Sequence, residues 1–226
     1  MIIKKDYDAP QLSKAEVLRY SGASGSIDPK LEALADECIK EAAGQLSYKV
    51  CYDFFDVVTD GKKVKLAGEF EAESLALSKL LAGSDTVLVF AATVGVGMDR
   101  LIARYGEIMP SKALMMQSLG AERIEALCDA FCADIGGELA RTGKYLTRRF
   151  SPGYADLSLD FQRSIFRLIS PEMNIGLTLN DSLLMTPSKS VTAIAGITVG
   201  KPDLSAVCEN KCALCAKTDC AFRSSL

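Results

Sequence analysis

The sequence of 226 residues contains no histidine and no tryptophan. Without histidine the chain cannot form a Ser-His-Asp triad, use an imidazole as a general acid or base, or bind a metal through imidazole. A Gly-Lys-Ser/Thr phosphate-binding loop is also missing, which argues against a nucleoside triphosphatase. These absences exclude a large share of the common hydrolase, metalloenzyme and nucleotide-binding sites.

Long apolar runs and basic tracts are missing too. The best apolar stretch, residues 86–96, is roughly half the length needed to cross a bilayer. The N-terminus has no apolar segment typical of a signal peptide. The net charge is −3, with both signs spread along the chain. We therefore expect a cytoplasmic protein with neither nucleic acid nor a membrane as partner.

Hydrophobic periodicity indicates both helices and strands. Asp28 followed by Pro29 is a typical helix start. The pattern predicts helices over 29–46, 71–81, 95–105, 111–142 and 159–169, and strands over 48–58, 64–66, 87–92, 175–179 and 190–199. Val94-Gly95-Val96-Gly97 lacks the third glycine of a dinucleotide-binding loop, so a tight turn into a helix is favoured.

This mixture predicts an α+β fold. We expect a single domain with a twisted, mostly antiparallel sheet flanked by helices, one of them long, plus a small Cys-rich C-terminal knuckle. The expected divisions are an N-terminal arm over 1–27, the main domain over 28–200 and the Cys-rich tail over 201–226. Four scattered cysteines among apolar residues are interpreted as buried small hydrophobes.

The segment Arg149-Phe-Ser-Pro-Gly-Tyr154 concentrates a cation, a Pro-Gly bend and an aromatic ring. Pro-Gly favours a type II turn, arginine can bind a carboxylate through two hydrogen bonds, and tyrosine offers a ring face and a hydroxyl. On composition alone, an ordinary surface turn is the default interpretation.

The segment is followed by Ile175-Gly-Leu-Thr-Leu-Asn-Asp-Ser-Leu-Leu-Met-Thr-Pro-Ser-Lys-Ser-Val191. Together the two segments resemble the activation domain of cobalamin-dependent methionine synthase, which binds S-adenosylmethionine. That family has an Arg-x-x-Pro-Gly-Tyr loop, a helix, and then a Gly-x-x-Leu-Thr-Glu-Ser-x-x-Met-x-Pro-x-x-Ser-Val segment. Here Ala155 replaces the proline that follows the family's tyrosine, and Asn180-Asp181 replaces its Thr-Glu pair.

The resemblance implies roles for individual residues. Arg149 would bind the carboxylate of the ligand's methionine part, and the backbone around Ser151 and Gly153 would bind the adenine or ribose. Tyr154, the implied catalytic-site residue, would lie beside the methyl group that is transferred. Glu125, or Asp129 one turn later, would be the acidic residue of the long helix, although both are also typical of a solvated helix face.

The same resemblance implies the reaction and its partners. Cobalamin that has reached its Co(II) form would gain an electron, and the resulting cob(I)alamin would take the methyl group of S-adenosylmethionine. Because the chain has no histidine to place below cobalt, the cobalamin would be held by a methionine synthase or another corrinoid protein. A one-electron donor such as flavodoxin or ferredoxin is also implied. The chain would then be a methyltransferase component that needs this partner for activity.

The C-terminal tail contains four closely spaced cysteines, Cys208, Cys212, Cys215 and Cys220. Four thiols within thirteen residues favour a metal site, and both zinc and an iron–sulfur cluster suit thiolate ligands. Two other functions therefore stay open. The chain could be a non-catalytic adaptor of corrinoid proteins, or an electron-transfer activator that works through the Cys cluster.

Overall fold

The computed structural model describes residues 1–23 and 28–200. Its elements are β1 (Ile3–Tyr7), α1 (Lys14–Tyr20), α2 (Pro29–Ala42), β2 (Tyr48–Asp60), β3 (Lys63–Leu66), β4 (Phe70–Glu73), α3 (Leu75–Leu80), β5 (Ser84–Thr93), α4 (Val96–Gly106), α5 (Pro110–Ala140), β6 (Lys144–Leu146), α6 (Phe161–Ile169), α7 (Pro171–Ile175), β7 (Thr178–Leu179), β8 (Met185–Thr186) and β9 (Ser190–Val199). The four tail cysteines lie outside the described residues.

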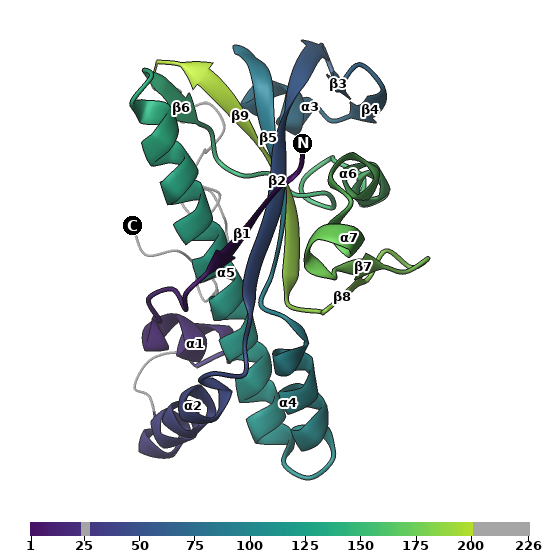
Figure 1. Cartoon of the computed structure of the whole chain (residues 1–226). Helices are drawn as coiled ribbons and strands as arrows, with labels where there is room; N and C mark the ends of the chain where they lie inside the picture. The colour runs from purple at the N-terminus through teal and green to yellow at the C-terminus, as the bar shows by residue number, and fades with distance from the viewer. Residues whose placement is uncertain (24–27, 201–226) are drawn as a thin grey trace, which may run out of the picture.

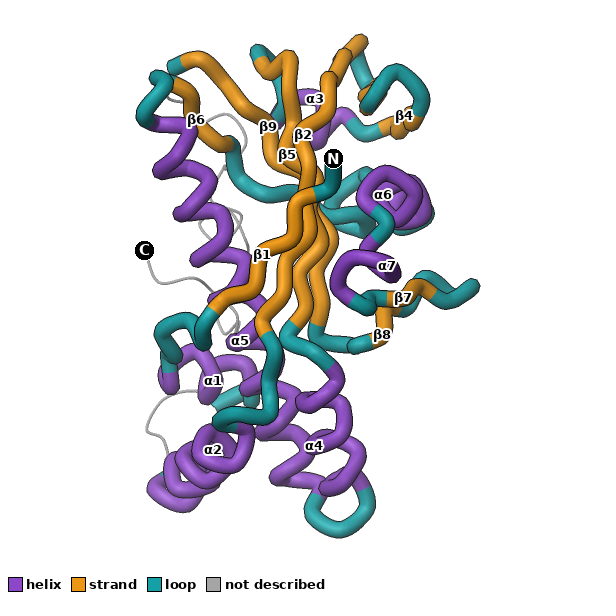
Figure 2. Tube along the Cα trace, viewed as in Figure 1, coloured by secondary structure: helices purple, strands orange, loops and turns teal. Residues whose placement is uncertain are grey.

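A seven-stranded antiparallel sheet forms the centre of the fold. Its order is β4-β3-β2-β5-β9-β6. Strand β1 also pairs with β2, along the same edge of β2 that β3 occupies further on. Figure 1 shows the sheet nearly edge-on, with the long helix α5 along one face and α6 and α7 against the other. The tube view in Figure 2 shows α1, α2 and α4 gathered around one end of α5. The predicted α+β fold is confirmed.

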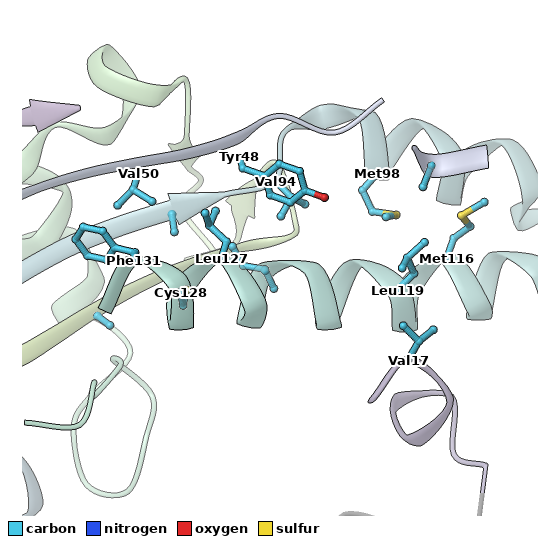
Figure 3. Packing of buried hydrophobic residues seen from close by; sticks show 14 of the residues in the cluster. Val17, Tyr48, Val50, Val94, Met98, Met116, Leu119, Leu127, Cys128 and Phe131 are labelled. Atoms are coloured by element: carbon cyan, nitrogen blue, oxygen red, sulfur yellow. The ribbon is translucent and has the colours of Figure 1, made fainter. Parts of the chain in front are cut away.

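Both faces of the sheet are buried. Along β5, Leu88, Phe90 and Ala92 enter the core on the α5 side, while the alternate residues face a second core under α3, α6 and α7. This follows from the two-residue period of a strand. Figure 3 shows the first core, where Leu127 and Phe131 of α5 pack near Val50 of β2. Burial on both faces explains why the central strand reads as one continuous apolar run.

Most predicted elements are present, but four short elements differ from the prediction. Residues 71–73 belong to strand β4 and not to a helix, because they pair with β3 and the helix α3 starts only after its N-cap, Ser74. Residue 175 ends helix α7, and the strand β7 begins at Thr178. The sequence predicts no strand between 142 and 159, but residues 144–146 form the strand β6, which pairs with β9. Residues 3–7, assigned to an arm, form strand β1.

The two glycines at the start of α4 allow close packing against a neighbouring segment. Gly95 has a φ of +79°, and a Cβ there would lie 2.2 Å from the Ser47 hydroxyl oxygen. A Cβ on Gly97 would lie 1.9 Å from the carbonyl oxygen of Gln45. Both positions need glycine because the chain turns sharply into the helix and touches a neighbouring segment. The tight-turn interpretation is confirmed.

The scattered cysteines are free thiols in or near the core. Cys38, Cys51 and Cys128 are buried, and Cys132 is partly exposed. Burial raises the pKa of Cys38 to about 11 and that of Cys51 to about 12. Such thiols are inert at neutral pH. Among the described helices, none is long and apolar enough to cross a membrane.

Candidate functional site

The loop Arg149–Tyr154, called the motif loop below, runs along the outer edge of β9 between β6 and α6. Phe150 donates its backbone N–H to the Ile194 carbonyl at 2.8 Å and accepts the Ile194 N–H at 2.9 Å. Neighbouring residues of an extended segment point to opposite sides. The side chain of Phe150 accordingly enters the second core, while that of Arg149 reaches α5. The loop thus presents its cation on the α5 side of the sheet.

The Pro-Gly bend forms the predicted type II turn. The N–H of Tyr154 donates to the Ser151 carbonyl at 3.1 Å, with Pro152 and Gly153 between them. Gly153 has a φ of +84°, as the third residue of this turn requires. The Tyr154 side chain is 62% exposed and meets the ring of Phe150 edge to face. The turn therefore presents a supported aromatic ring at the surface.

The next two residues hold the loop in place. Ala155 has a φ of +49°, a conformation that proline cannot adopt, so the loop in this geometry does not accept proline at this position. The Asp156 carboxylate accepts hydrogen bonds from the Ser74 hydroxyl at 2.5 Å and from the Leu75 N–H at 2.7 Å. These bonds lower the pKa of Asp156, the Ser74 hydroxyl having the largest effect. The carboxylate joins the motif loop to the start of α3.

Arg149 binds both acidic residues that the sequence singled out on α5. One guanidinium nitrogen contacts Glu125 and another contacts Asp129, each at 2.5 Å. Burial alone would lower the pKa of Arg149, but the hydrogen bond to Asp129 and the neighbouring negative charges raise it above its ordinary value. The two alternatives for the acidic residue are therefore adjacent, one helical turn apart, and share one arginine.

Glu125 and Asp129 also line a hollow of about 530 Å³ between α1 and α5, called the α1–α5 groove. Glu16 and Tyr20 of α1 line the opposite side, one turn apart. Burial and, next, the charge of Glu125 raise the pKa of Tyr20, so its hydroxyl stays protonated. Sequence reasoning missed both residues, because the periodicity of a short helix does not tell which partner its polar face meets.

A buried ion pair adjoins this groove, and its acidic member, Glu122, lines it. Glu122 and Arg123 are adjacent on α5, and their side chains are 5% and 4% exposed. Glu122 accepts the Ser13 backbone N–H, and Arg123 donates to the carbonyls of Pro10 and Gln11. This pair fastens the segment before α1 to the long helix and so fixes the position of α1 across the groove.

The Asn180-Asp181 pair lies in the turn between β7 and β8, away from Arg149. The Asn180 side chain accepts the Leu184 N–H, and the Asp181 carbonyl accepts a hydrogen bond from Arg163. Both residues stabilise this hairpin through local hydrogen bonds. The shorter side chains at these positions therefore serve the turn, and no carboxylate from this pair joins the Arg149 cluster.

Comparisons with known proteins agree with this description. The family model described as the vitamin B12-dependent methionine synthase activation domain matches residues 71–203, more than half of the chain. The crystal structure of the MetH reactivation domain bound to AdoHcy aligns with a TM-score of 0.64 and 14% identity, covering 89% of this chain and 80% of that chain. No curated protein sequence is measurably similar. The chain belongs to the vitamin B12-dependent methionine synthase activation domain family.

Proposed function

We propose that this chain binds S-adenosylmethionine and donates its methyl group to a reduced cobalamin held by a partner, in methionine synthesis or a related corrinoid methyltransferase system. The observation that carries the proposal is the contact of Arg149, in the loop that ends at Tyr154, with Glu125 and Asp129 of the α1–α5 groove. The family and the AdoHcy bound to its structural relative support the same ligand class.

The charges of this cluster suit the two ends of an α-amino acid. A ligand carboxylate can take the place of one acidic side chain on Arg149, since guanidinium binds two carboxylate oxygens well. The released carboxylate of Glu125 or Asp129 can then bind the ligand's ammonium group. A zwitterion entering the cluster therefore replaces one ion pair by two and leaves no charge unpaired.

The rest of the ligand is also accommodated. The groove is lined by the carboxylates of Glu16, Glu122, Glu125 and Asp129, which are paired with Arg19, Arg123 and Arg149. These groups together carry one excess negative charge, which favours a cationic sulfonium. The exposed ring of Tyr154 can lie beside the methyl group and align it toward an incoming partner. Because the methyl donor is already activated, the site needs no general acid or base. The corrin of the partner would supply the nucleophile.

Calorimetry on the full chain tests this proposal. S-adenosylmethionine and S-adenosylhomocysteine should bind, and Arg149→Ala should weaken binding by about 2–5 kcal/mol, the usual cost of removing one partner of a buried charge pair. Arg141→Ala, an exposed arginine just after α5, is the control and should leave the affinity unchanged. Wild-type chain that binds neither ligand would reject the proposal and favour the adaptor or the electron-transfer activator.

Two further variants identify the residue that binds the ammonium group. Glu125→Gln and Asp129→Asn keep the side-chain size and remove one charge each. The variant with the larger loss of affinity marks the ammonium ligand. Methyl transfer to a cobalamin-loaded methionine synthase that lacks its own activation domain, with reduced flavodoxin or ferredoxin present, then tests the partner. Transfer should require the chain and should fail with Arg149→Ala.

A further inference from the structure

Helix α1 presents to the α1–α5 groove an aromatic residue that has no role so far. Tyr20 lines the groove opposite Glu125 and Asp129 of α5. Val17 and Leu18 of the same helix are buried in the first core, and α1 lies beside α5 (Figure 1). The short helix is therefore a fixed wall of the groove, and packing sets the place of Tyr20 in that wall.

The ring of Tyr20 is held by its neighbour on the helix. The guanidinium of Arg19 lies 4.5 Å from the centre of this ring, an attractive arrangement of a cation and an aromatic face. Arg19 also donates to both carboxylate oxygens of Glu16, at 2.6–3.1 Å. The Glu16 carboxylate is thus already paired within α1. The hydroxyl of Tyr20 is the polar group that this helix still offers to the groove.

The Tyr20 hydroxyl faces Glu125. The charge of Glu125 is, after burial, the largest cause of the raised pKa of Tyr20, so the hydroxyl is protonated at neutral pH. Arg19 can only donate hydrogen bonds, and no described residue accepts the hydroxyl proton of Tyr20. Glu125 contacts Arg149 through Oε2, which leaves Oε1 to accept this proton. A hydrogen bond to a carboxylate is stronger than one to a neutral acceptor.

We propose that Tyr20 is a positioning residue of the Arg149 cluster, whose hydroxyl donates to Glu125 and holds that carboxylate toward the ammonium group of the bound ligand. This inference rests on the proposed function. When the ligand carboxylate takes a place on Arg149, one of the two acids must leave the guanidinium. Glu125 has a second donor across the groove, whereas Asp129 lies one turn further along α5. Glu125 therefore turns to the ammonium group, and Asp129 stays on Arg149.

Two ligands test this role on the full chain. S-adenosylhomocysteine carries the carboxylate that releases Glu125, whereas 5′-methylthioadenosine has neither a carboxylate nor an ammonium group. Tyr20→Phe removes the hydroxyl and keeps the ring under Arg19. In calorimetry it should weaken binding of S-adenosylhomocysteine about fivefold, the effect of one hydrogen bond, and leave the affinity for 5′-methylthioadenosine unchanged. Equal losses for both ligands would indicate a structural role and overturn the inference.

A double-mutant cycle identifies the partner of the hydroxyl. Tyr20→Phe should have no further effect on S-adenosylhomocysteine binding in a Glu125→Ala chain, because the acceptor is gone, and should keep its effect in an Asp129→Ala chain. Additive losses with Glu125→Ala would contradict the proposed contact. Tyr145→Phe is the matched control, since Tyr145 of β6 is also partly exposed and lines neither side of the groove. It should alter neither affinity.

The failure of this inference can be told apart from the failure of the proposed function. Wild-type chain that binds no S-adenosylhomocysteine contradicts the proposed function. Binding that is lost in Arg149→Ala but is the same in Tyr20→Phe as in wild type overturns only the role of Tyr20. Thermal unfolding of Tyr20→Phe should match that of wild type, since the packing of the ring is kept, and so separates a loss of affinity from a loss of fold.

Discussion

Arg123 and Arg149 both bind carboxylates of α5, yet replacing them with alanine should have opposite consequences. Arg123→Ala would leave the Glu122 carboxylate 5% exposed without its cation and would free the carbonyls of Pro10 and Gln11. Breaking such a buried pair typically costs about 3–5 kcal/mol. We therefore expect Arg123→Ala to lower the free energy of unfolding by that amount and to loosen α1 from α5.

Arg149→Ala removes two contacts whose acidic partners are far more exposed. The side chains of Glu125 and Asp129 are 44% and 71% exposed, so water can solvate both after the change. Ion pairs of this kind contribute about 1 kcal/mol or less each. The loss of stability should therefore be smaller than for Arg123→Ala, whereas the loss of ligand affinity should be large.

Urea unfolding measures the free energy of unfolding of both variants. It is followed by far-ultraviolet circular dichroism, since the chain has no tryptophan to report by fluorescence. Arg141→Ala supplies the baseline for an exposed arginine. The double variant Glu122→Leu with Arg123→Met should recover part of the stability. It removes the unpaired buried charge, but leaves the Ser13 N–H and the carbonyls of Pro10 and Gln11 without these partners. Equal destabilisation by Arg123→Ala and Arg149→Ala would refute the reasoning and indicate that Arg149 is held mainly for structure.

Three other predictions concern the loop, the α4 turn and the tail. Asp156→Asn should lower the free energy of unfolding at neutral pH, and the difference from wild type should shrink as the pH falls below about 3.8. Folding lowers the pKa of Asp156, so the stabilisation by its carboxylate is present above the ordinary pKa and is lost on acidification. A difference that stays constant with pH in urea titrations would contradict this. Gly97→Ala should cost about 1–3 kcal/mol because its Cβ would meet the Gln45 carbonyl, while Gly106→Ala in the same helix has open space and should cost nothing in thermal unfolding; equal effects would argue against the contact. Anaerobically purified chain should contain iron or zinc, measured by elemental analysis, that is lost in Cys212→Ser; metal-free wild-type chain would dismiss the predicted site.

The sequence determined the central features of the fold by itself. The continuous apolar run of β5 and the 3.6-residue period of α5 are long and regular, so local pattern and final structure agree. Short elements were harder. Strand β1 carries lysines and an aspartate on an exposed edge, and its pairing with β2 comes from the sheet and not from its own pattern. In β4 the charged residues alternate with Phe70 and Ala72, as in a strand, but four residues are too few to be told apart from the helical pattern that follows from Ser74.

In the candidate site, too, some features follow from the local sequence and others only from the tertiary structure. The Pro-Gly turn and the Arg149 cation could be read directly, because a type II turn depends on the residues that form it. Two choices remained open without a structure: whether Glu125 or Asp129 faces the arginine, and which acid stands across the groove. The tertiary structure brings both to Arg149 and places Glu16 opposite them. Residues more than one hundred positions apart meet there because Val17 and Leu18 of α1 share the core with α5, and because the ion pair of Glu122 and Arg123 fastens the segment before α1.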